Sequence, residues 1–197
     1  MTGKAGWNVL LLRRRKILAR QKRQGDIMKR IAQFEKVSFE QFLKDWSGVS
    51  AGDGESRIRE IYDRIRLPLR ATAGSAGYAF FAPEAFSLKA GEGLKIPTGI
   101  RVRMEDGWVL KLYPRSGLGF RYRLQLDNTV GIIDGDYYGS DNEGHIQIKV
   151  TNDGREGRVM SVAAGAGFAQ GIFVEYGITM DDSADGMRNG GFGSTSV

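Results

Sequence analysis

A short apolar run followed by acidic residues offers a candidate general base. Val130–Ile133 is followed directly by Asp134, and Asp136 comes two residues later. Asp134-Gly135 is also typical of a hairpin turn, so an ordinary turn acid has the same pattern. A carboxylate at the end of a packed strand can take a proton from water. This segment therefore predicts hydrolytic chemistry if groups that bind a substrate lie near it.

Two further segments combine groups that bind phosphate. Tyr113–Gly119 turns through one proline and two glycines and carries Arg115 and Ser116. Backbone N–H groups in such a turn, an arginine fork and a hydroxyl can together bind phosphate oxygens, although a plain turn has the same composition. The glycine-rich C-terminus offers an arginine, two hydroxyls and a ring that can stack on a base: Arg188, Ser194, Thr195 and Phe192.

The composition excludes several other kinds of site. The 197 residues contain no cysteine and one histidine, His145, which argues against thiol nucleophiles, zinc–thiolate centres and multi-histidine metal sites. We interpret His145 as an ordinary strand residue beside a loop. Hydrophobic residues make up 41% of the chain, enough for a packed core. No apolar run approaches the roughly 18–20 residues of a membrane span, so no membrane partner is expected.

The net charge of +6 belongs to the beginning of the chain. Residues 1–27 contain eight basic residues and one acid, whereas the rest contains 21 basic and 22 acidic residues. Such a leader is compatible with a disordered extension, with sequence upstream of a start at Met28, with a transit peptide, or with an arm that binds nucleic acid or anionic lipid. We expect a disordered extension or sequence upstream of a start at Met28. Nucleic acid is then a partner only if this leader binds it.

The elements that must position these groups are short strands. From about Leu67, β-rich runs alternate with Gly, Asn and Asp turns. No long helical pattern separates them, so the pattern favours an all-β, jelly-roll-like barrel over a βαβ nucleotide-binding sheet. The expected strands are Tyr78–Ala82, Leu94–Met104, Trp108–Tyr113, Leu124–Ile133, His145–Thr151, Arg158–Ala163 and Gly171–Ile178.

Two short helices are expected before the strands. Ser38 and Gln41 have the spacing of a capping box, and apolar residues recur at helical spacing from Ile58 to Ile65. Pro68 ends the second helical pattern. The chain thus divides into a basic leader, a short helical extension, a β domain and a mobile glycine-rich arm: residues 1–27, 28–66, 67–180 and 181–197.

Five segments of the chain, in order, resemble the five motifs of the trimeric dUTPase (deoxyuridine triphosphate nucleotidohydrolase) family. Single motifs of this size recur by chance, but five in order at compatible spacing are a specific signal. The resemblance implies a jelly-roll-like β fold, a homotrimer with shared active sites and a cytoplasmic enzyme. The five segments are Ala76–Phe80, Pro114–Leu118, Gly131–Tyr137, Gly165–Gln170 and Arg188–Thr195.

The resemblance also implies a reaction and roles for residues. The family hydrolyses dUTP to dUMP and pyrophosphate, with Mg2+ held by the substrate phosphates and water rather than directly by the protein. Asp134 would activate the attacking water, Tyr137 would pack on the deoxyribose and exclude a 2′-hydroxyl, and Asn128 would read the uracil edge. Phe192 would lie over the uracil. The resemblance implies further substrate contacts by Arg115, Ser116, Gly117, Gly131, Gln170, Arg188, Gly193, Ser194 and Thr195.

The chain departs from the family pattern at several positions. Ala79 stands where the first motif carries Asp, and Gly167 stands where the fourth carries Arg. The fifth motif has one residue fewer than usual between Arg188 and Phe192, and a longer loop, 139–144, follows the third. Because the missing Asp lies toward the metal–phosphate side of the site, we expect Ala79 to slow turnover without abolishing it.

Three other functions stay open at this point. A nucleotide-binding or regulatory homologue with weak catalysis would explain Ala79. A dCTP deaminase shares the fold but needs a differently patterned arginine–serine segment and a catalytic glutamate, and Glu143, in the loop after the hairpin, fits that role poorly. A nucleic-acid binder would act through the leader. Pyrophosphate release from dUTP and ammonia release from dCTP would separate the two enzymes.

Overall fold

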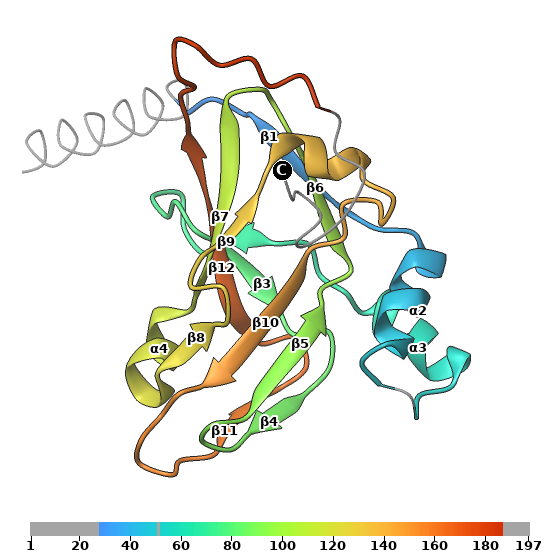
Figure 1. Ribbon diagram of the computed structural model, residues 1–197. Helices are drawn as coiled ribbons and strands as arrows, with labels where there is room; N and C mark the ends of the chain where they lie inside the picture. Colours follow the sequence, from blue (N-terminus) through green and yellow to red (C-terminus); the bar gives the residue numbers. More distant parts are fainter. Residues whose placement is uncertain (1–27, 51, 187–197) are drawn as a thin grey trace, which may run out of the picture. The chain divides into compact units, whose positions relative to one another are not determined.

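Short strands dominate the computed structural model, which describes residues 28–50 and 52–186 (Figure 1). The described residues from Ala32 to Gly186 belong to one unit, in which every described strand pairing is antiparallel. The largest sheet has the order β2 (Leu69–Arg70), β3 (Tyr78–Phe81), β12 (Gly167–Glu175), β7 (Trp108–Pro114) and β9 (Gly131–Ile133).

Three smaller sheets complete the strand pairing of the described residues. The first has the order β5 (Gly93–Pro97), β10 (Gln147–Asn152) and β8 (Leu124–Leu126). The other two are pairs: β1 (Ala32–Lys36) with β6 (Ile100–Met104), and β4 (Phe86–Leu88) with β11 (Met160–Val162). This mostly-β architecture agrees with the expectation from the sequence.

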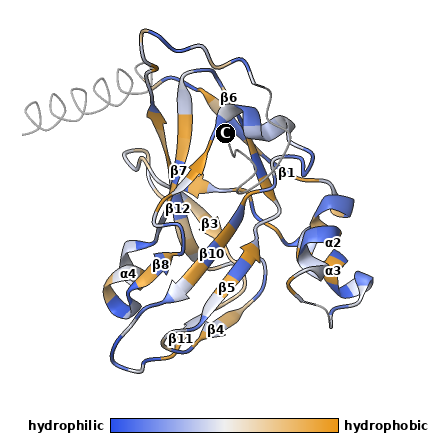
Figure 2. Ribbon diagram, viewed as in Figure 1, coloured by the Kyte–Doolittle hydropathy of each residue, from blue (hydrophilic) through white to orange (hydrophobic). Residues whose placement is uncertain are grey.

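The core lies between the sheets, and hydrophobic residues alternate with hydrophilic ones along several strands (Figure 2). In β10, Ile148 and Val150 are buried while Lys149 between them is exposed. This period of two is the pattern of a strand with one face on the core. The largest fully buried side chains of the sheets include Phe80, Leu110, Leu112, Ile148 and Phe168.

Two expected strands are each divided into two by a turn. The expected strand Leu94–Met104 breaks after Pro97, because Gly99 has a φ of +71° and leads the chain from β5 into β6. The expected strand Leu124–Ile133 breaks into β8 and β9, with Thr129 at a φ of +66°. Left-handed residues end regular strand geometry, and neither turn was recognised from the sequence.

The segment 28–66 is not wholly helical, which corrects the sequence-based division of the chain. Helices α2 (Phe39–Ser47) and α3 (Glu55–Asp63) occur as expected, but Ala32–Lys36 forms strand β1 and pairs with β6. The pairing satisfies the backbone groups of the β6 edge, which local sequence cannot indicate because the partner lies more than 60 residues away. No helix among the described residues is long and apolar enough to cross a membrane.

The start of α2 confirms half of the expected capping box. The Ser38 side chain accepts a hydrogen bond from the Gln41 backbone N–H at 3.1 Å. The Gln41 side chain does not return to Ser38, since its amide nitrogen donates to Asp45 at 2.8 Å. Glu143 takes the place of Gln41 and accepts from the Ser38 N–H at 2.8 Å and from the Ser38 hydroxyl at 2.5 Å.

The sequence suggested that His145 is a strand residue, but it lies just before β10 and is fully buried. Its Nδ1 is 2.5 Å from Asp45 Oδ2 on α2, and its Nε2 accepts from the Gly99 backbone N–H at 2.8 Å. The imidazole thus joins α2 to the turn between β5 and β6.

Two short helices follow strands where the sequence indicated only turns: α4 (Ser116–Tyr122) and the 3₁₀ helix η1 (Gly135–Gly139).

Candidate active site

Three of the five motif-like segments lie on adjacent strands of the five-stranded sheet. Ala79 of β3 and Tyr113 of β7 lie directly opposite Gln170 of β12, one on each side of it. Residues that are directly opposed across paired strands point to the same face of a sheet. Ala79, Gln170 and Tyr113 therefore form a row, and a carboxylate at position 79 would lie beside the Gln170 amide.

Gln170 is held where these three segments meet. Its amide nitrogen donates to the Pro114 carbonyl at 3.4 Å. On the other side, its Oε1 lies 3.1 Å from the point that a Cβ at Gly77 would occupy. The close approach of Gly77 leaves room for this amide, so the first, second and fourth motif-like segments pack around one side chain.

Arg115 lies against Gly167, one of the positions that depart from the family pattern. A Cβ on Gly167 would lie 2.7 Å from Arg115 Nη1, and the same nitrogen donates to the Gly167 carbonyl at 3.4 Å. The Arg115 side chain thus occupies the space that a side chain at position 167 would need. Ser116 and Gly117 follow it as the exposed first residues of α4.

The third motif-like segment runs along the other side of β7. Gly131 is opposite Leu112, and its backbone approaches so closely that an added Cβ would lie 2.9 Å from the Leu112 Cβ. Asp134 follows β9, is half-buried and occupies the N-cap position of η1. Asn128 is exposed in the connection between β8 and β9.

The strand register separates Asp134 from the phosphate-binding candidates of the same chain. Ile133 is opposite Leu110, so Asp134 lies one residue beyond that pair, while Arg115 lies five residues away in the opposite direction along β7. Six residues at about 3.3 Å each amount to roughly 20 Å of strand. A general base works within hydrogen-bond reach of its water, about 3 Å, so one chain does not bring these groups to one phosphate.

The Tyr137 ring is packed inside the protein, with only 3% of the residue exposed. Its hydroxyl donates to the His145 carbonyl at 2.9 Å and accepts from the Asn142 amide at 2.8 Å. These contacts fix the ring beside the loop that follows η1. Its role at a deoxyribose stays a prediction, as do the other assigned roles. The expected C-terminal contacts lie outside the described residues: Arg188, Phe192, Gly193, Ser194 and Thr195.

Residues that the sequence did not single out also border this site. Tyr138 follows Tyr137 in η1 and bonds to Glu35 of β1, whose carboxylate lies 2.8 Å from its hydroxyl. The tyrosine pair was visible in the sequence, but its two hydroxyls were not distinguishable there. No group of three or more His, Asp or Glu side chains among residues 28–50 and 52–186 is arranged to hold a metal ion.

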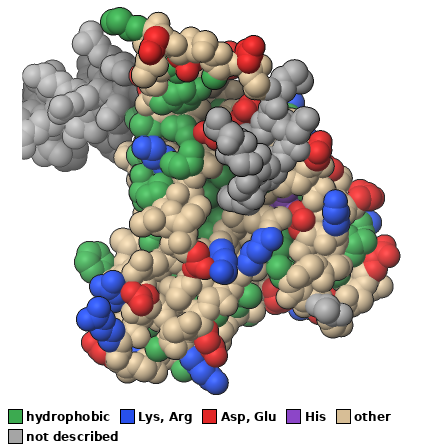
Figure 3. All heavy atoms as spheres, viewed as in Figure 1, with side chains coloured by type: hydrophobic (Ala, Val, Ile, Leu, Met, Phe, Trp, Pro, Cys, Tyr) green, Lys and Arg blue, Asp and Glu red, His purple; other side chains and the backbone are tan. Residues whose placement is uncertain are grey.

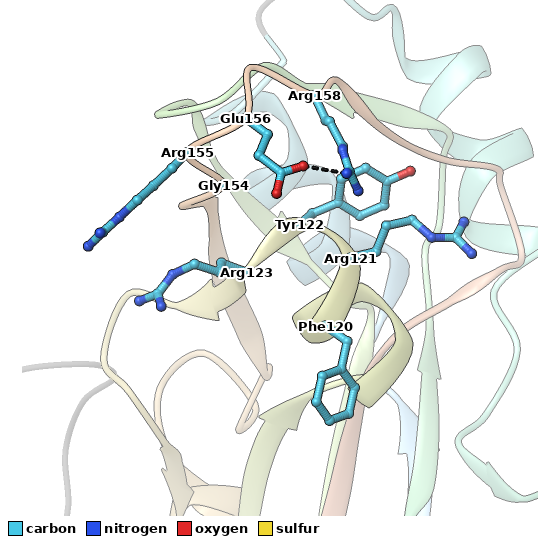
Figure 4. A pocket seen from close by; sticks show the side chains of 8 residues that line it. All are labelled: Phe120, Arg121, Tyr122, Arg123, Gly154, Arg155, Glu156 and Arg158. Atoms are coloured by element: carbon cyan, nitrogen blue, oxygen red, sulfur yellow. Dashed lines mark ion pairs between the residues drawn. The ribbon is translucent and has the colours of Figure 1, made fainter.

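A pocket of about 270 Å³ lies at the end of α4 (Figure 4). Arg158 and Glu156 form an ion pair in its wall, and none of the residues assigned to substrate lines it. Its lining residues are Phe120, Arg121, Tyr122, Arg123, Gly154, Arg155, Glu156 and Arg158. The candidate site is therefore not this pocket.

Comparison with known proteins gives a consistent result. A family model described as dUTPase matches residues 63–196. The deoxyuridine 5'-triphosphate nucleotidohydrolase of Lactococcus lactis is 40% identical over 136 residues, which cover 68% of this chain and 89% of that protein. The protein of the same name from Hahella chejuensis is 39% identical over 147 residues, covering 71% of this chain and 92% of that one.

Solved structures agree with the fold. The dUTPase from Streptococcus mutans has a TM-score of 0.53 and 31% identity, and the match covers 74% of this chain and 97% of that chain. The Staphylococcus bacteriophage 80alpha dUTPase with dUPNHPP has a TM-score of 0.55, with coverage of 86% and 100%, but at 20% identity it supports the fold alone. These matches confirm the jelly-roll-like β fold expected from the sequence.

Proposed function

The chain belongs to the dUTPase family, and from that premise we propose that it hydrolyses dUTP to dUMP and pyrophosphate with Asp134 as general base. The observation that supports this assignment is the packing of three motif-like segments around Gln170, with Asp134 at the end of a strand in the same sheet. Supply of dUMP and removal of dUTP from the nucleotide pool, in the cytoplasm, would be its role.

In the proposed reaction, water attacks the α-phosphorus while Asp134 takes its proton. The bond from the α-phosphorus to the bridging oxygen breaks, and pyrophosphate leaves with the bonding electrons. Phosphoryl transfer of this kind depends mainly on position and charge neutralisation. Ser116, Gly117 and Gln170 would hold phosphate oxygens, and Arg115 would add positive charge.

A divalent metal ion, which we propose to be Mg2+, would travel with the triphosphate. The donor set fits that arrangement better than a protein-held ion, because the residue beside Gln170 is Ala79 and not a carboxylate. Mg2+ usually keeps several waters and binds substrate phosphates. When bound there, it would neutralise negative charge on the phosphates.

We propose that the complete site is shared between chains of a homotrimer. The roughly 20 Å between Asp134 and Arg115 along β7 supports this, because a second copy can bring its phosphate-binding residues to the first copy's base. Apolar side chains also gather on the surface over β7, β9 and β12 (Figure 3). Ile132, Val174 and Tyr176 are 46%, 36% and 53% exposed, and exposed apolar patches often mark protein interfaces.

A catalytically weak, nucleotide-binding homologue is the second candidate, and Ala79 is the observation that favours it. A carboxylate at this position would lie beside Gln170, at the junction of the three segments. A dCTP deaminase has less support, because the Glu143 carboxylate already accepts two hydrogen bonds from Ser38 at the start of α2. It lies in a structural cap and not on the row that contains Gln170.

Pyrophosphate release from dUTP, dCTP, UTP and dTTP with Mg2+ tests the proposal. We expect turnover of dUTP above the other nucleotides, and a loss of at least 100-fold in Asp134→Asn, the usual scale for removal of a general base. Asp136→Asn, two residues away, is the matched control and should keep most of the activity. Turnover of dUTP equal in wild type and Asp134→Asn would refute the assignment of the base.

A further inference from the structure

The 3₁₀ helix η1, directly after Asp134, is tied to a segment that precedes the part of the chain matched by the family model. We call residues 32–62 the N-terminal extension; they contain β1, α2 and most of α3. The family model begins at residue 63. Contacts between this extension and η1 therefore join residues before the matched segment to the third motif-like segment within it.

The direct contact is made by Tyr138. Its hydroxyl donates to Glu35 Oε2 at 2.8 Å and accepts from Arg103 Nη2 at 2.9 Å. The guanidinium carbons of Arg101 and Arg103 lie 4.5 Å and 4.8 Å from the centroid of its ring. The ring is thus held between two cations of β6, and its hydroxyl is held by a carboxylate of the extension.

Backbone pairing sets the position of that carboxylate. Glu35 lies directly opposite Arg101 in the β1–β6 pair, and Arg101 Nη2 donates to Glu35 Oε2 at 3.1 Å. The hydrogen bond from Tyr138 is the largest influence on the Glu35 carboxyl and, with the neighbouring arginines, holds its pKa below the usual value against the effect of burial. Glu35 is therefore charged at neutral pH and accepts strong hydrogen bonds.

Two indirect contacts reach the other side of η1. The Tyr137 hydroxyl donates to the carbonyl of His145, whose ring is held by Asp45 of α2. Ser38, at the start of α2, is bonded to Glu143 in the loop after η1. Both tyrosines of η1 and the loop behind it are thus connected to the extension.

We infer that the N-terminal extension is a positioning element for the third motif, and that Glu35 and Tyr138 are positioning residues that orient η1. The inference rests on the proposed function, in which Asp134 activates water, and on the role beside the deoxyribose that the family resemblance implies for Tyr137. A short 3₁₀ helix has weak hydrogen-bond geometry of its own, so side-chain contacts fix its orientation. Misplacement by about 1 Å can lower a rate about 100-fold.

The decisive measurement is the selectivity for dUTP over UTP, taken as the ratio of their kcat/KM values. Tyr138→Phe removes the hydroxyl and keeps the ring between the arginines; Glu35→Gln removes the charge and keeps the size. We expect each variant to lower this selectivity at least fivefold, and the double variant to lose little more than either alone. Gln33→Ala, an exposed position on the same strand, is the matched control and should stay within twofold.

A merely structural role would change thermal stability and the amount of active protein but not selectivity between two sugars. Selectivity within twofold of wild type in both single variants would therefore overturn the inference, whatever happens to kcat. An equal loss in Gln33→Ala would also overturn it. Circular dichroism of each variant confirms that the compared proteins are folded.

Binding of the monophosphates separates this inference from the proposed reaction. If the wild type releases no pyrophosphate from dUTP, the proposed reaction fails, and calorimetry with dUMP and UMP decides the inference. A preference for dUMP in the wild type that falls at least fivefold in Tyr138→Phe supports the positioning role. An unchanged preference, or no dUMP binding by the wild type, overturns it.

Discussion

Asp45 accepts hydrogen bonds from two buried side chains, so its replacement gives a quantitative test of how α2 is attached. His145 Nδ1 and the Gln41 amide nitrogen lie 2.5 Å and 2.8 Å from Asp45 Oδ2. His145 is 0% exposed and Gln41 is 8% exposed. Because His145 Nε2 accepts from the Gly99 N–H, we assign the proton of the neutral ring to Nδ1, which then donates to Asp45.

Asp45→Ala removes the acceptor for both donors and keeps them buried. A buried donor without a partner costs about 1–3 kcal/mol, so we expect a loss of about 2–4 kcal/mol in the free energy of unfolding. That is a large share of the roughly 5–15 kcal/mol typical of a domain. Asp45→Asn keeps a carbonyl oxygen at the same place, and about 1 kcal/mol should be lost as charged hydrogen bonds become neutral.

Urea unfolding followed by tryptophan fluorescence measures these differences, because Trp46 is buried on the same helix. Lys44→Ala, an exposed position of α2, is the matched control and should stay within about 0.5 kcal/mol of wild type. The reasoning about buried donors fails if Asp45→Ala also stays within that range. It fails equally if Asp45→Asn loses as much as Asp45→Ala, since the amide retains an acceptor.

The same pair gives a pH dependence with a definite sign. Burial acts to raise the pKa of Asp45, but hydrogen bonds from His145 and Gln41 outweigh it and leave this pKa below its usual value. A carboxyl with a lowered pKa in the folded state stabilises the protein above the unfolded pKa of about 3.9, and this contribution is lost as the pH falls further. Wild type should therefore lose more stability between pH 5 and pH 3 than Asp45→Asn, whereas parallel losses would contradict the lowered pKa.

Three further predictions follow from single positions. Gly99→Ala should lower the free energy of unfolding, measured in urea, by about 2–4 kcal/mol, because its φ of +71° disfavours a side chain and an added Cβ would lie 2.3 Å from Ile65 Cδ1. The control Gly107→Ala has a φ of +81° but nothing within 4 Å of an added Cβ, so it should lower the free energy of unfolding by only about 1–2 kcal/mol. Equal losses in the two variants would contradict the steric contribution of Ile65. Ser38→Ala should lower the free energy of unfolding by about 0.5–2 kcal/mol, because it removes the N-cap of α2. An unchanged free energy of unfolding would contradict this prediction. Ala79→Asp should raise the rate of pyrophosphate release from dUTP, and an unchanged rate would show that position 79 does not limit turnover.

Local signals in the sequence predicted those parts of the fold that depend on local chemistry. The Ser38 cap, the alternation around Ile148 and the order of the motif-like segments were all readable, because each is set by residues close together in the chain. The all-β class followed from the same signals. The turns at Gly99 and Thr129 were missed because apolar residues continue on both sides of them and concealed the change of direction.

Long-range pairing explains most of what the sequence could not supply. Strand β1 has no local signal, since its partner β6 lies far along the chain and its own residues are only partly buried. The bond between Glu35 and Tyr138 joins residues 103 positions apart. Likewise, the separation of Asp134 from Arg115 could be derived only from the register of β7 with β9. The candidate residues could be proposed from the sequence, whereas their separation along the direction of β7 could not.

Two departures from the family pattern are linked by a third residue. By resemblance, the family has Asp at position 79 and Arg at position 167, whereas this chain has Ala79 and Gly167. One negative and one positive charge are therefore both absent, so these two positions leave the net charge of the site the same as in the family pattern. The Arg115 side chain fills the space above Gly167, with Nη1 2.7 Å from where a Cβ would stand. A guanidinium therefore still lies beside the fourth motif, supplied from the second. A side chain restored at position 167 alone would displace Arg115. A carboxylate restored at position 79 would instead lie between Gln170 of β12 and Leu69 of β2, the residues opposite it on the two neighbouring strands. The first departure is thus the one that a single substitution can reverse without displacing Arg115.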